Sequence, residues 1–354
     1  MWIFLLLSAG LFMGWSLGTN DAANAFGTAV ATRVIKYRTA IIIIAIMVLL
    51  GAAFLGHNNI DKLSSIATNN EVVASPEDVE AAVEAGTLAT LRLKSALKAF
   101  IIFACAGITV FVMSYLKFPV SANQSITGAV IGWGLCYANY SDPAVLKGNV
   151  TEMLEFASTW LINPLGAAAI SFVLVFFVKK FLEKRLTSMK HYDLVVKAGY
   201  LIAGAFSAFS IGQNSSASVT AFYYDATGVG ANLLTNARLT AIVGGIAIAV
   251  GVLTFSKRVM MTVGGEIAHI SQIDGFVVII ASALTVLLMG ELMGIPVSTS
   301  QSVVGAVVGA GLVNGVKNVN FGVFKRIAIA WVSSPTAAGL LTYAVAWLAK
   351  GYFA

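Results

Sequence analysis

The chain carries one eighteen-residue segment twice. Residues 118–135 read Phe-Pro-Val-Ser-Ala-Asn-Gln-Ser-Ile-Thr-Gly-Ala-Val-Ile-Gly-Trp-Gly-Leu, and residues 295–312 read Ile-Pro-Val-Ser-Thr-Ser-Gln-Ser-Val-Val-Gly-Ala-Val-Val-Gly-Ala-Gly-Leu. The copies align without gaps, agree at 11 of 18 positions and start 177 residues apart (295 − 118) in a chain of 354 residues. A spacing of half the chain indicates an internal duplication. Small residues alone would fit helix packing, but polar side chains beside a proline favour a function.

Each copy opens with Pro-Val-Ser, at 119–121 and at 296–298, inside apolar sequence. Proline lacks the backbone N–H and disfavours helix in the residue before it. Broken helices at membrane depth are tolerated only inside protein or beside a water-filled cavity. We therefore expect a broken or re-entrant helix at each Pro-Val-Ser. The helix that starts there presents free N–H groups and a positive dipole end, which suit an anion.

The composition around these segments is that of a membrane protein. Hydrophobic residues make up 58% of the chain, charged residues 11%, and the mean hydropathy is +0.87. A soluble domain of this length needs more charge to cover its surface. A helix crosses the hydrocarbon with roughly 20 apolar residues. Runs of about that length occur at 39–56, 96–116, 156–178, 234–255 and 275–294.

Several function classes find no support in the sequence. Cys105 and Cys136 stand far apart in apolar surroundings, so neither a disulfide framework nor a metal site is expected. The three histidines are isolated from one another, and no nucleophile with a base is found, so an enzyme is not expected. Basic residues lie at the ends of apolar spans, which is not the pattern of a nucleic-acid binder. No cofactor is expected.

The charges of the loops predict the topology. Basic residues mark cytoplasmic loops, so the basic residues after the first span and the strongly basic segment 179–192 fall inside. The acidic loop 57–94 then falls outside, as do both termini. The prediction is a multi-pass protein of the cell membrane in contact with lipid. The cytoplasmic assignment rests on Arg33, Lys36, Arg38, Lys179, Lys180, Lys184, Arg185 and Lys190.

Five crossings per half give the two halves opposite orientations. Secondary transporters often use such inverted repeats, and their discontinuous helices meet near the bilayer midplane. The predicted fold is therefore an all-α integral membrane protein of about ten spans in two inverted repeats. The first repeat covers 1–192, with the external loop 57–94 and the cytoplasmic linker 179–192, and the second covers 193–354.

The two helix starts supply the donors that a small oxyanion needs. Serine and threonine offer hydroxyl donors, and asparagine and glutamine offer amides that donate or accept. The predicted anion-binding residues are Ser121, Asn123, Gln124, Ser125, Ser298, Thr299, Ser300 and Gln301.

Residues 18–28, Gly-Thr-Asn-Asp-Ala-Ala-Asn-Ala-Phe-Gly-Thr, place an acid inside an apolar stretch. Intramembrane acids are by default candidates for function, although Asp21 in a helix cap is the plainer alternative. Carboxylate and amide oxygens suit a hard cation such as Na⁺, and Asp21 could instead carry a coupling proton. The predicted coupling-ion residues are Asn20, Asp21, Asn24, Asn214 and Ser215, with Na⁺ at Asn20, Asp21 and Asn214.

Together these motifs resemble the inorganic phosphate transporter (PiT) family, which includes sulfate permeases, over nearly the full chain. The resemblance rests on residues 18–28, on the paired Pro-Val-Ser segments, on Trp-Val-Ser-Ser-Pro at 331–335 and on residues 258–267. It implies an inverted repeat, external termini and symport of an inorganic anion with Na⁺ or H⁺. It is also compatible with a homodimer. The site residues that it implies are Asn20, Asp21, Asn24, Ser121, Asn214, Ser298, Thr299 and Ser300.

The chain departs from the family pattern at three places. The family usually repeats Asn-Asp in its second half, whereas Ser215 follows Asn214 here, and the usual Ser-Thr-Thr of both helix starts is altered. The large hydrophilic loop between the halves is also missing. Phosphate near neutral pH keeps a proton that needs an acceptor, whereas sulfate is best met by donors alone. The loss of one acid therefore moves the expectation toward sulfate, while Asp21 keeps phosphate open.

The sequence thus predicts a symporter of inorganic phosphate coupled to Na⁺ or H⁺, with a sulfate permease of the same family as the alternative. An anion channel is the rival class, because channels also use broken helices and rings of oxygen atoms. A channel would conduct without coupling or saturable exchange.

Overall fold

The computed structural model describes residues 2–59, 76–137, 143–182, 185, 188–223, 236–293 and 297–353. This part of the chain is helical apart from turns and one isolated antiparallel bridge between Ala268 and Val319. The helices are α1 (Trp2–Ala31), α2 (Tyr37–Leu55), η1 (Gly56–Asn59), α4 (Pro76–Glu84), α5 (Leu88–Tyr115), α6 (Ala122–Tyr137), α7 (Pro143–Phe177), η2 (Val178–Leu182), α8 (Met189–Thr220), η4 (Ala221–Tyr223), α9 (Ala237–Phe255), α10 (Lys257–Met261), η5 (Thr262–Glu266), α11 (Gln272–Met293), α12 (Thr299–Val313), η6 (Val316–Asn318), α13 (Phe321–Leu348) and α14 (Lys350–Phe353).

Seven helical segments in the described residues are long and apolar enough to cross a bilayer. Five of them coincide with the apolar runs predicted from the sequence, which confirms the all-helical membrane class. The segments Met189–Tyr223 and Phe321–Leu348 add two more. Helix α1 is also long, at about 45 Å for its 30 residues, but polar residues interrupt its apolar sequence. Ten crossings therefore stay a prediction.

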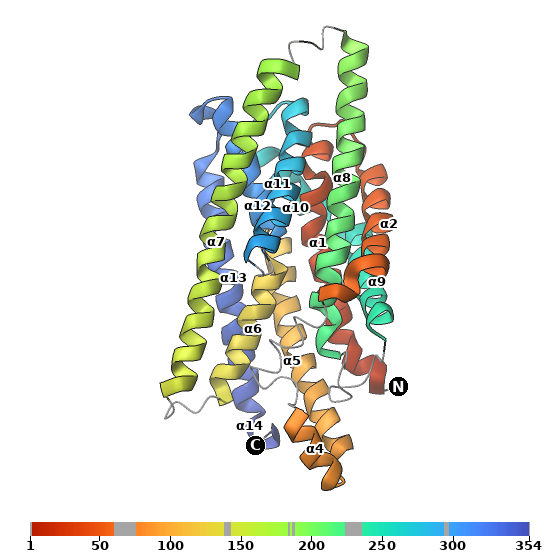
Figure 1. Ribbon diagram of the computed structural model, residues 1–354, viewed down its shortest axis with the longest axis vertical. Helices are drawn as coiled ribbons and strands as arrows, with labels where there is room; N and C mark the ends of the chain where they lie inside the picture. Colours follow the sequence, from red (N-terminus) through yellow and green to blue (C-terminus); the bar gives the residue numbers. More distant parts are fainter. Residues whose placement is uncertain are drawn as a thin grey trace.

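The helices stand side by side along the long axis of the molecule (Figure 1). Both ends of the chain lie toward the bottom of this view, and the end of η2 and the beginning of α8 lie at the top. The sidedness predicted from the loop charges stays a prediction.

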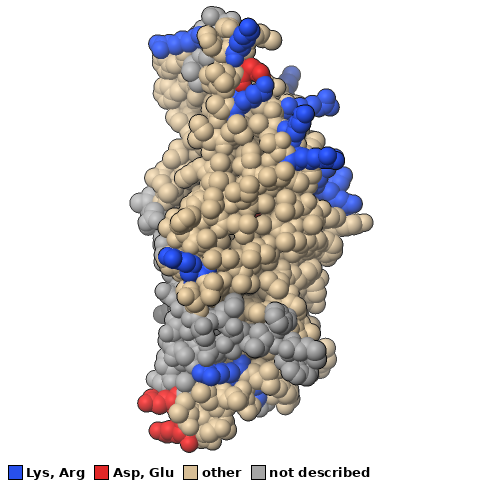
Figure 2. Space-filling view, turned by 90° about the vertical axis from the view of Figure 1, so that its right-hand side faces the viewer, with Lys and Arg blue, Asp and Glu red and all other residues tan. Residues whose placement is uncertain are grey.

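The surface is banded by charge. Most Lys and Arg side chains on the face in Figure 2 gather at the upper end, above a broad uncharged region. Large apolar side chains project from the helices outward, among them Leu161 at 69%, Ile202 at 72% and Leu340 at 66% exposure. Such side chains would be costly in water and are natural against lipid.

The first Pro-Val-Ser segment breaks the helix as predicted. Helix α5 ends at Tyr115 and α6 begins at Ala122. Lys117 turns the chain with a φ of 68°, in the left-handed region that residues other than glycine rarely adopt. In the second copy α11 ends at Met293 and α12 begins at Thr299. The proline of that copy, Pro296, lies outside the described residues.

The two halves of the sequence pack across one another. Helix α6 of the first half packs against α13 of the second, and α12 of the second half packs against α7 of the first. Glycine makes both contacts close, because a methyl group at Gly128 would overlap the backbone of Pro335 and one at Gly305 would overlap that of Pro164. The duplicated glycines therefore serve packing, between backbones of opposite halves.

A second pair of crossed contacts surrounds the polar motif of α1. Helix α1 packs against α9, and α8 packs against α2. A side chain at Gly18 on α1 would overlap the backbone of Ile248, and one at Gly212 on α8 would overlap that of Val48. Gly18 opens Gly-Thr-Asn-Asp at 18–21 and Gly212 opens the similar Gly-Gln-Asn-Ser at 212–215, so two related segments have related surroundings.

Candidate functional site

The polar motif of α1 lies within an unbroken helix and is sealed from solvent. Asn20 is 0% exposed, Asp21 3% and Asn24 1%. None of them is at a helix end, because α1 runs from Trp2 to Ala31, so Asp21 does not cap this helix. A buried carboxylate is costly unless it has partners or a role, which strengthens the functional interpretation of Asp21.

Asn20 holds the first helix break in place. Its amide nitrogen donates to the Ser114 hydroxyl at 2.9 Å and to the Phe118 carbonyl at 3.0 Å. Its amide oxygen accepts the N–H of Val120 at 3.0 Å. These bonds satisfy backbone groups on both sides of Pro119, which no regular helix would satisfy. The Asn20 oxygen keeps one lone pair for a cation, so its structural and ligand roles are compatible.

Asp21 and Asn24 reach the second helix start instead. The Asn24 amide nitrogen lies 3.1 Å from both the Thr299 and the Ser300 hydroxyl oxygens. The Ser300 hydroxyl in turn donates to the Asp21 carboxylate at 3.2 Å. Two predicted coupling-ion residues and two predicted anion residues, about 280 positions apart in sequence, therefore form one hydrogen-bonded group.

Each helix start is capped by its own serine. The Ser121 hydroxyl oxygen accepts from the N–H of Gln124 at 3.3 Å, and that of Ser298 accepts from the N–H of Gln301 at 3.2 Å. A serine that accepts in this way still has its hydroxyl hydrogen for a ligand. Ser125 is different, since its hydroxyl donates to the Ser121 carbonyl at 3.2 Å.

Four amide side chains near the helix starts keep unsatisfied atoms. Both amide atoms of Gln124 and of Gln301 are buried without a hydrogen-bond partner among the described residues, as are the side-chain oxygens of Asn24 and Asn123. Buried polar atoms are rarely left unpaired in proteins, so each needs an explanation such as a ligand or a water. They supply two donors and four acceptors that no other described group of the protein uses.

The coupling-ion residues predicted in the second half lie on α8 and are not hydrogen-bonded to this group in the described part of the chain. Asn214 and Ser215 sit near the end of α8, half-buried and buried respectively. Helix α8 contacts α6, as α1 contacts α12, so their place is related to that of the α1 motif. The hydrogen bonds of the described residues do not join Asn214 or Ser215 to Asp21.

Two contributors to the site were missed in the sequence. Ser114 lies in the last turn of α5, against Asn20. Asn163 of α7 is 1% exposed and donates to the Ser298 carbonyl at 2.8 Å. The signal for Asn163 was available, because it directly precedes Pro164, and Trp160 with Pro164 repeats the spacing of Trp331 with Pro335.

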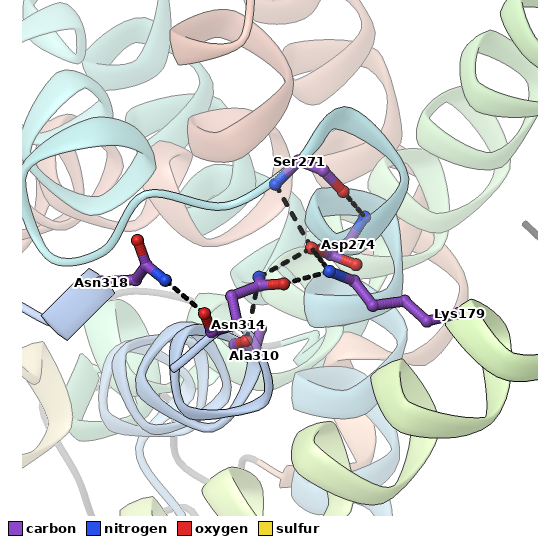
Figure 3. Close-up of polar contacts among 6 residues, drawn as sticks. All are labelled: Lys179, Ser271, Asp274, Ala310, Asn314 and Asn318. Atoms are coloured by element: carbon purple, nitrogen blue, oxygen red, sulfur yellow. Dashed lines mark hydrogen bonds and ion pairs between the residues drawn. The ribbon is translucent and has the colours of Figure 1, made fainter. Parts of the chain in front are cut away.

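A second polar cluster, also missed, lies at the end of α12 away from the site. It is built around Asp274, which is fully buried in the first turn of α11 (Figure 3). Its carboxylate lies 3.4 Å from the Lys179 ammonium and accepts from the Asn314 amide at 3.0 Å. Lys179 also donates to the Asn314 side-chain oxygen. Ser271 and Asp274 exchange backbone-to-side-chain bonds of 3.3 and 3.2 Å, which cap α11.

This cluster joins the ends of three helices. Lys179 follows α7, Asn314 ends α12 and Asp274 begins α11. Lys179 was interpreted from the sequence only as a marker of a basic loop, and the structure gives it a buried partner. In the described part of the chain no group of three or more His, Cys, Asp or Glu side chains could hold a metal ion.

Comparison with known proteins supports one family. The model of the phosphate transporter family matches residues 17–342. A protein of Pyrococcus abyssi named "Putative phosphate permease" is 27% identical, with 96% of each chain covered, and one of Methanocaldococcus jannaschii with that name is 26% identical, covering 97% of this chain and 96% of its own. A solved structure named "The sodium-dependent phosphate transporter" shares the fold with a TM-score of 0.73, 24% identity and 99% of each chain covered.

The family match spans both helix starts, the α1 motif and the crossed helix pairs described above. The chain therefore belongs to the phosphate transporter family and is a multi-pass membrane protein.

Proposed function

We propose that the protein is a symporter that carries inorganic phosphate across the cell membrane together with Na⁺. The observation that carries this proposal is the buried group in which Asp21 and Asn24 of α1 bond to Thr299 and Ser300 of α12. A cation bound at Asp21 and an anion bound at the start of α12 would share these side chains. Binding of one ion would then favour binding of the other, which is the requirement for coupling.

The unsatisfied amide oxygens support phosphate over sulfate. Phosphate near neutral pH carries one or two protons that need acceptors, and sulfate carries none. The oxygens of Asn24, Gln124 and Gln301 are buried acceptors without a partner among the described residues. They offset the loss of the acid at Ser215, which had moved the expectation from the sequence toward sulfate without displacing phosphate. A sulfate permease stays the alternative.

Na⁺ is proposed as the coupling ion because the ligand set is made of hard oxygen atoms. Asp21 offers a carboxylate, Asn20 keeps one lone pair, and Asn214 and Ser215 could complete a related set in the second half. The structurally similar transporter is called sodium-dependent, which agrees with this choice. A proton carried by Asp21 is the alternative.

The proposed architecture is two inverted repeats, 1–192 and 193–354, with ten crossings and external termini. The crossed pairs α6 with α13 and α12 with α7 support a twofold relation between the halves. The placement of the termini opposite the end of η2 and the beginning of α8 supports an odd number of crossings in each half (Figure 1). A homodimer is compatible with this arrangement.

Uptake into liposomes tests the proposal. We would reconstitute the purified protein and measure labelled phosphate and labelled sulfate uptake under an inward Na⁺ gradient or an inward pH gradient. The expected result is saturable phosphate uptake that needs the Na⁺ gradient, with sulfate a poor competitor.

Each other outcome points to a different conclusion. Sulfate uptake without phosphate uptake would reassign the anion. Phosphate uptake driven by the pH gradient in Na⁺-free buffer would make the proton the coupling ion. Flux that ignores both gradients and shows no counterflow would favour a channel.

A further inference from the structure

Asn163 stands beside a close contact between the backbones of α7 and α12. The backbone of Pro164 lies against Gly305, at a distance that leaves no space for a side chain at position 305. The residue before Pro164 therefore faces the first turn of α12, where the predicted anion residues begin. Asn163 is 1% exposed in this contact.

Both ends of the Asn163 amide are used on α12. The nitrogen donates to the Ser298 carbonyl at 2.8 Å, and the oxygen accepts from the Ser302 hydroxyl at 2.7 Å. The Ser298 carbonyl also accepts the backbone N–H of Ser302 at 3.1 Å, which is the first helical bond of the turn. A buried amide whose two groups are both paired is held in place, so Asn163 braces the first turn of α12.

The first turn of α12 is thereby held from two sides. Asn163 on α7 fixes Ser298 and Ser302, while Asn24 on α1 bonds to Thr299 and Ser300. The Ser298 hydroxyl oxygen already caps Gln301, which leaves its hydrogen available to a ligand beside the helix start. Fixing the backbone of Ser298 therefore also fixes the position of this hydroxyl.

The first helix start has no such brace in the described contacts. Position 334 corresponds to Asn163, because each directly precedes the proline of its helix, and Ser334 is 0% exposed with a hydroxyl that finds no partner among the described residues. The first helix start is held at Pro119, two residues before the capping Ser121. There the Trp331 indole donates to the Pro119 carbonyl at 3.0 Å. Serine is too short to repeat the bond that Asn163 makes.

We propose that Asn163 is a positioning residue that sets the Ser298 hydroxyl and the first turn of α12 for the oxyanion, and so determines the affinity of the second helix start for phosphate. This inference rests on the proposed function, since it names a determinant of the same anion site.

The test replaces Asn163 by the residue that the other half carries. We would measure labelled phosphate uptake in liposomes for Asn163→Ser, with Ser334→Ala as the matched control at the related buried position. The expected result for Asn163→Ser is a half-saturation concentration raised about tenfold, equivalent to about 1.4 kcal/mol, with the maximal rate per folded protein kept within about twofold. Ser334→Ala is expected to keep the wild-type half-saturation.

Two results would overturn the role of Asn163. One is an unchanged half-saturation in Asn163→Ser; the other is a fall in maximal rate alone, which would mean that the residue only stabilises the fold. If Asn163→Ser does not fold, Ser302→Ala removes one of the two bonds, and a half-saturation below about twice that of wild type would overturn the role. A wild-type protein without phosphate uptake would instead contradict the proposed function itself.

Discussion

The two helix starts share most of their sequence and are held in different ways. The first, at Pro119–Ser121, is fixed by Asn20 of its own half and by Trp331 of the other. The second, at Ser298, is fixed by Asn163 and is joined through Ser300 to a buried acid. A repeated sequence therefore gives two helices of the same shape in different chemical surroundings.

Under the proposed function, this difference would concentrate the coupling chemistry at the second helix start. One turn of α1 separates Asn20, which serves the backbone of the first start, from Asn24, which serves the hydroxyls of the second. At the first start, the amide of Gln124 is unpaired and the capping Ser121 still has its hydroxyl hydrogen available. These groups could bind an anion, and no charged side chain contacts them in the described part of the chain.

The far ends of the same two helices repeat the contrast. Helix α12 ends in the buried cluster of Lys179, Asp274 and Asn314. Helix α6 ends, in the described part of the chain, with a bond from the Lys350 ammonium to the Cys136 carbonyl at 3.3 Å. The second helix is thus firmly anchored at both ends, and the first mainly near its start.

The largest expected effect is that of Asp21→Asn, which removes the charge from the second helix start. Loss of one partner of a buried charge pair costs about 2–5 kcal/mol, so Na⁺-driven phosphate uptake should fall by about 30-fold or more. The control is Asp193→Asn, the same change in an exposed ion pair with Lys197. If Asp21→Asn keeps the wild-type Na⁺ dependence, the acid beside the second helix start does not take part in coupling, and the two starts do not differ in this respect.

The contacts of Lys179 at the C-terminal end of α12 should stabilise the fold more than the bond from Lys350 at the C-terminal end of α6. Lys179→Met leaves Asp274 buried without its cation and should lower the free energy of unfolding by about 2–3 kcal/mol, less than for a fully buried pair because the Lys179 side chain is 30% exposed. Lys350→Met removes one bond to a carbonyl and should cost about 1 kcal/mol or less. Thermal unfolding in detergent compares them, and equal shifts would contradict the contrast.

Substitutions of Asn20 and Asn24 should have different effects: the first should lower the stability of the fold, and the second should lower the affinity for phosphate. Asn20→Ala leaves the Val120 N–H and the Phe118 carbonyl unpaired, so the free energy of unfolding should fall by about 2 kcal/mol. Asn24→Ala should change the unfolding temperature little and raise the half-saturation for phosphate. The test is to measure the unfolding temperature and phosphate uptake of both variants. A lower unfolding temperature for Asn24→Ala and a higher half-saturation for Asn20→Ala would contradict these roles.

The smallest expected effect concerns the acid that the second half lacks at Ser215. Ser215 is buried on α8 and follows Asn214 in the sequence as Asp21 follows Asn20. We predict that Ser215→Asp lowers the Na⁺ concentration for half-maximal phosphate uptake about three- to tenfold, equivalent to about 0.7–1.4 kcal/mol. An unchanged Na⁺ dependence and an unchanged preference between phosphate and sulfate would show that the missing acid is incidental.

The local pattern predicted much of the fold. Apolar runs of spanning length became helices, and Pro119 ended α5, because both signals act within a few residues of chain. The α1 motif and both helix starts were also recognised from their residue types alone. The site prediction nevertheless treated Asn20 and Asn24 alike, and it counted Ser125 as a free donor.

Sequence alone determined that this is a duplicated membrane protein, where its helices break and which polar side chains lie in apolar surroundings. Hydrophobicity and proline geometry decide these features locally. Only the tertiary structure decided that α12 packs on α7 and α6 on α13, and hence that Asn163, Asn24 and Asp21 meet the second helix start. Those contacts join residues more than 130 positions apart, and no local pattern encodes them, because backbones of opposite halves approach only once the whole bundle has formed.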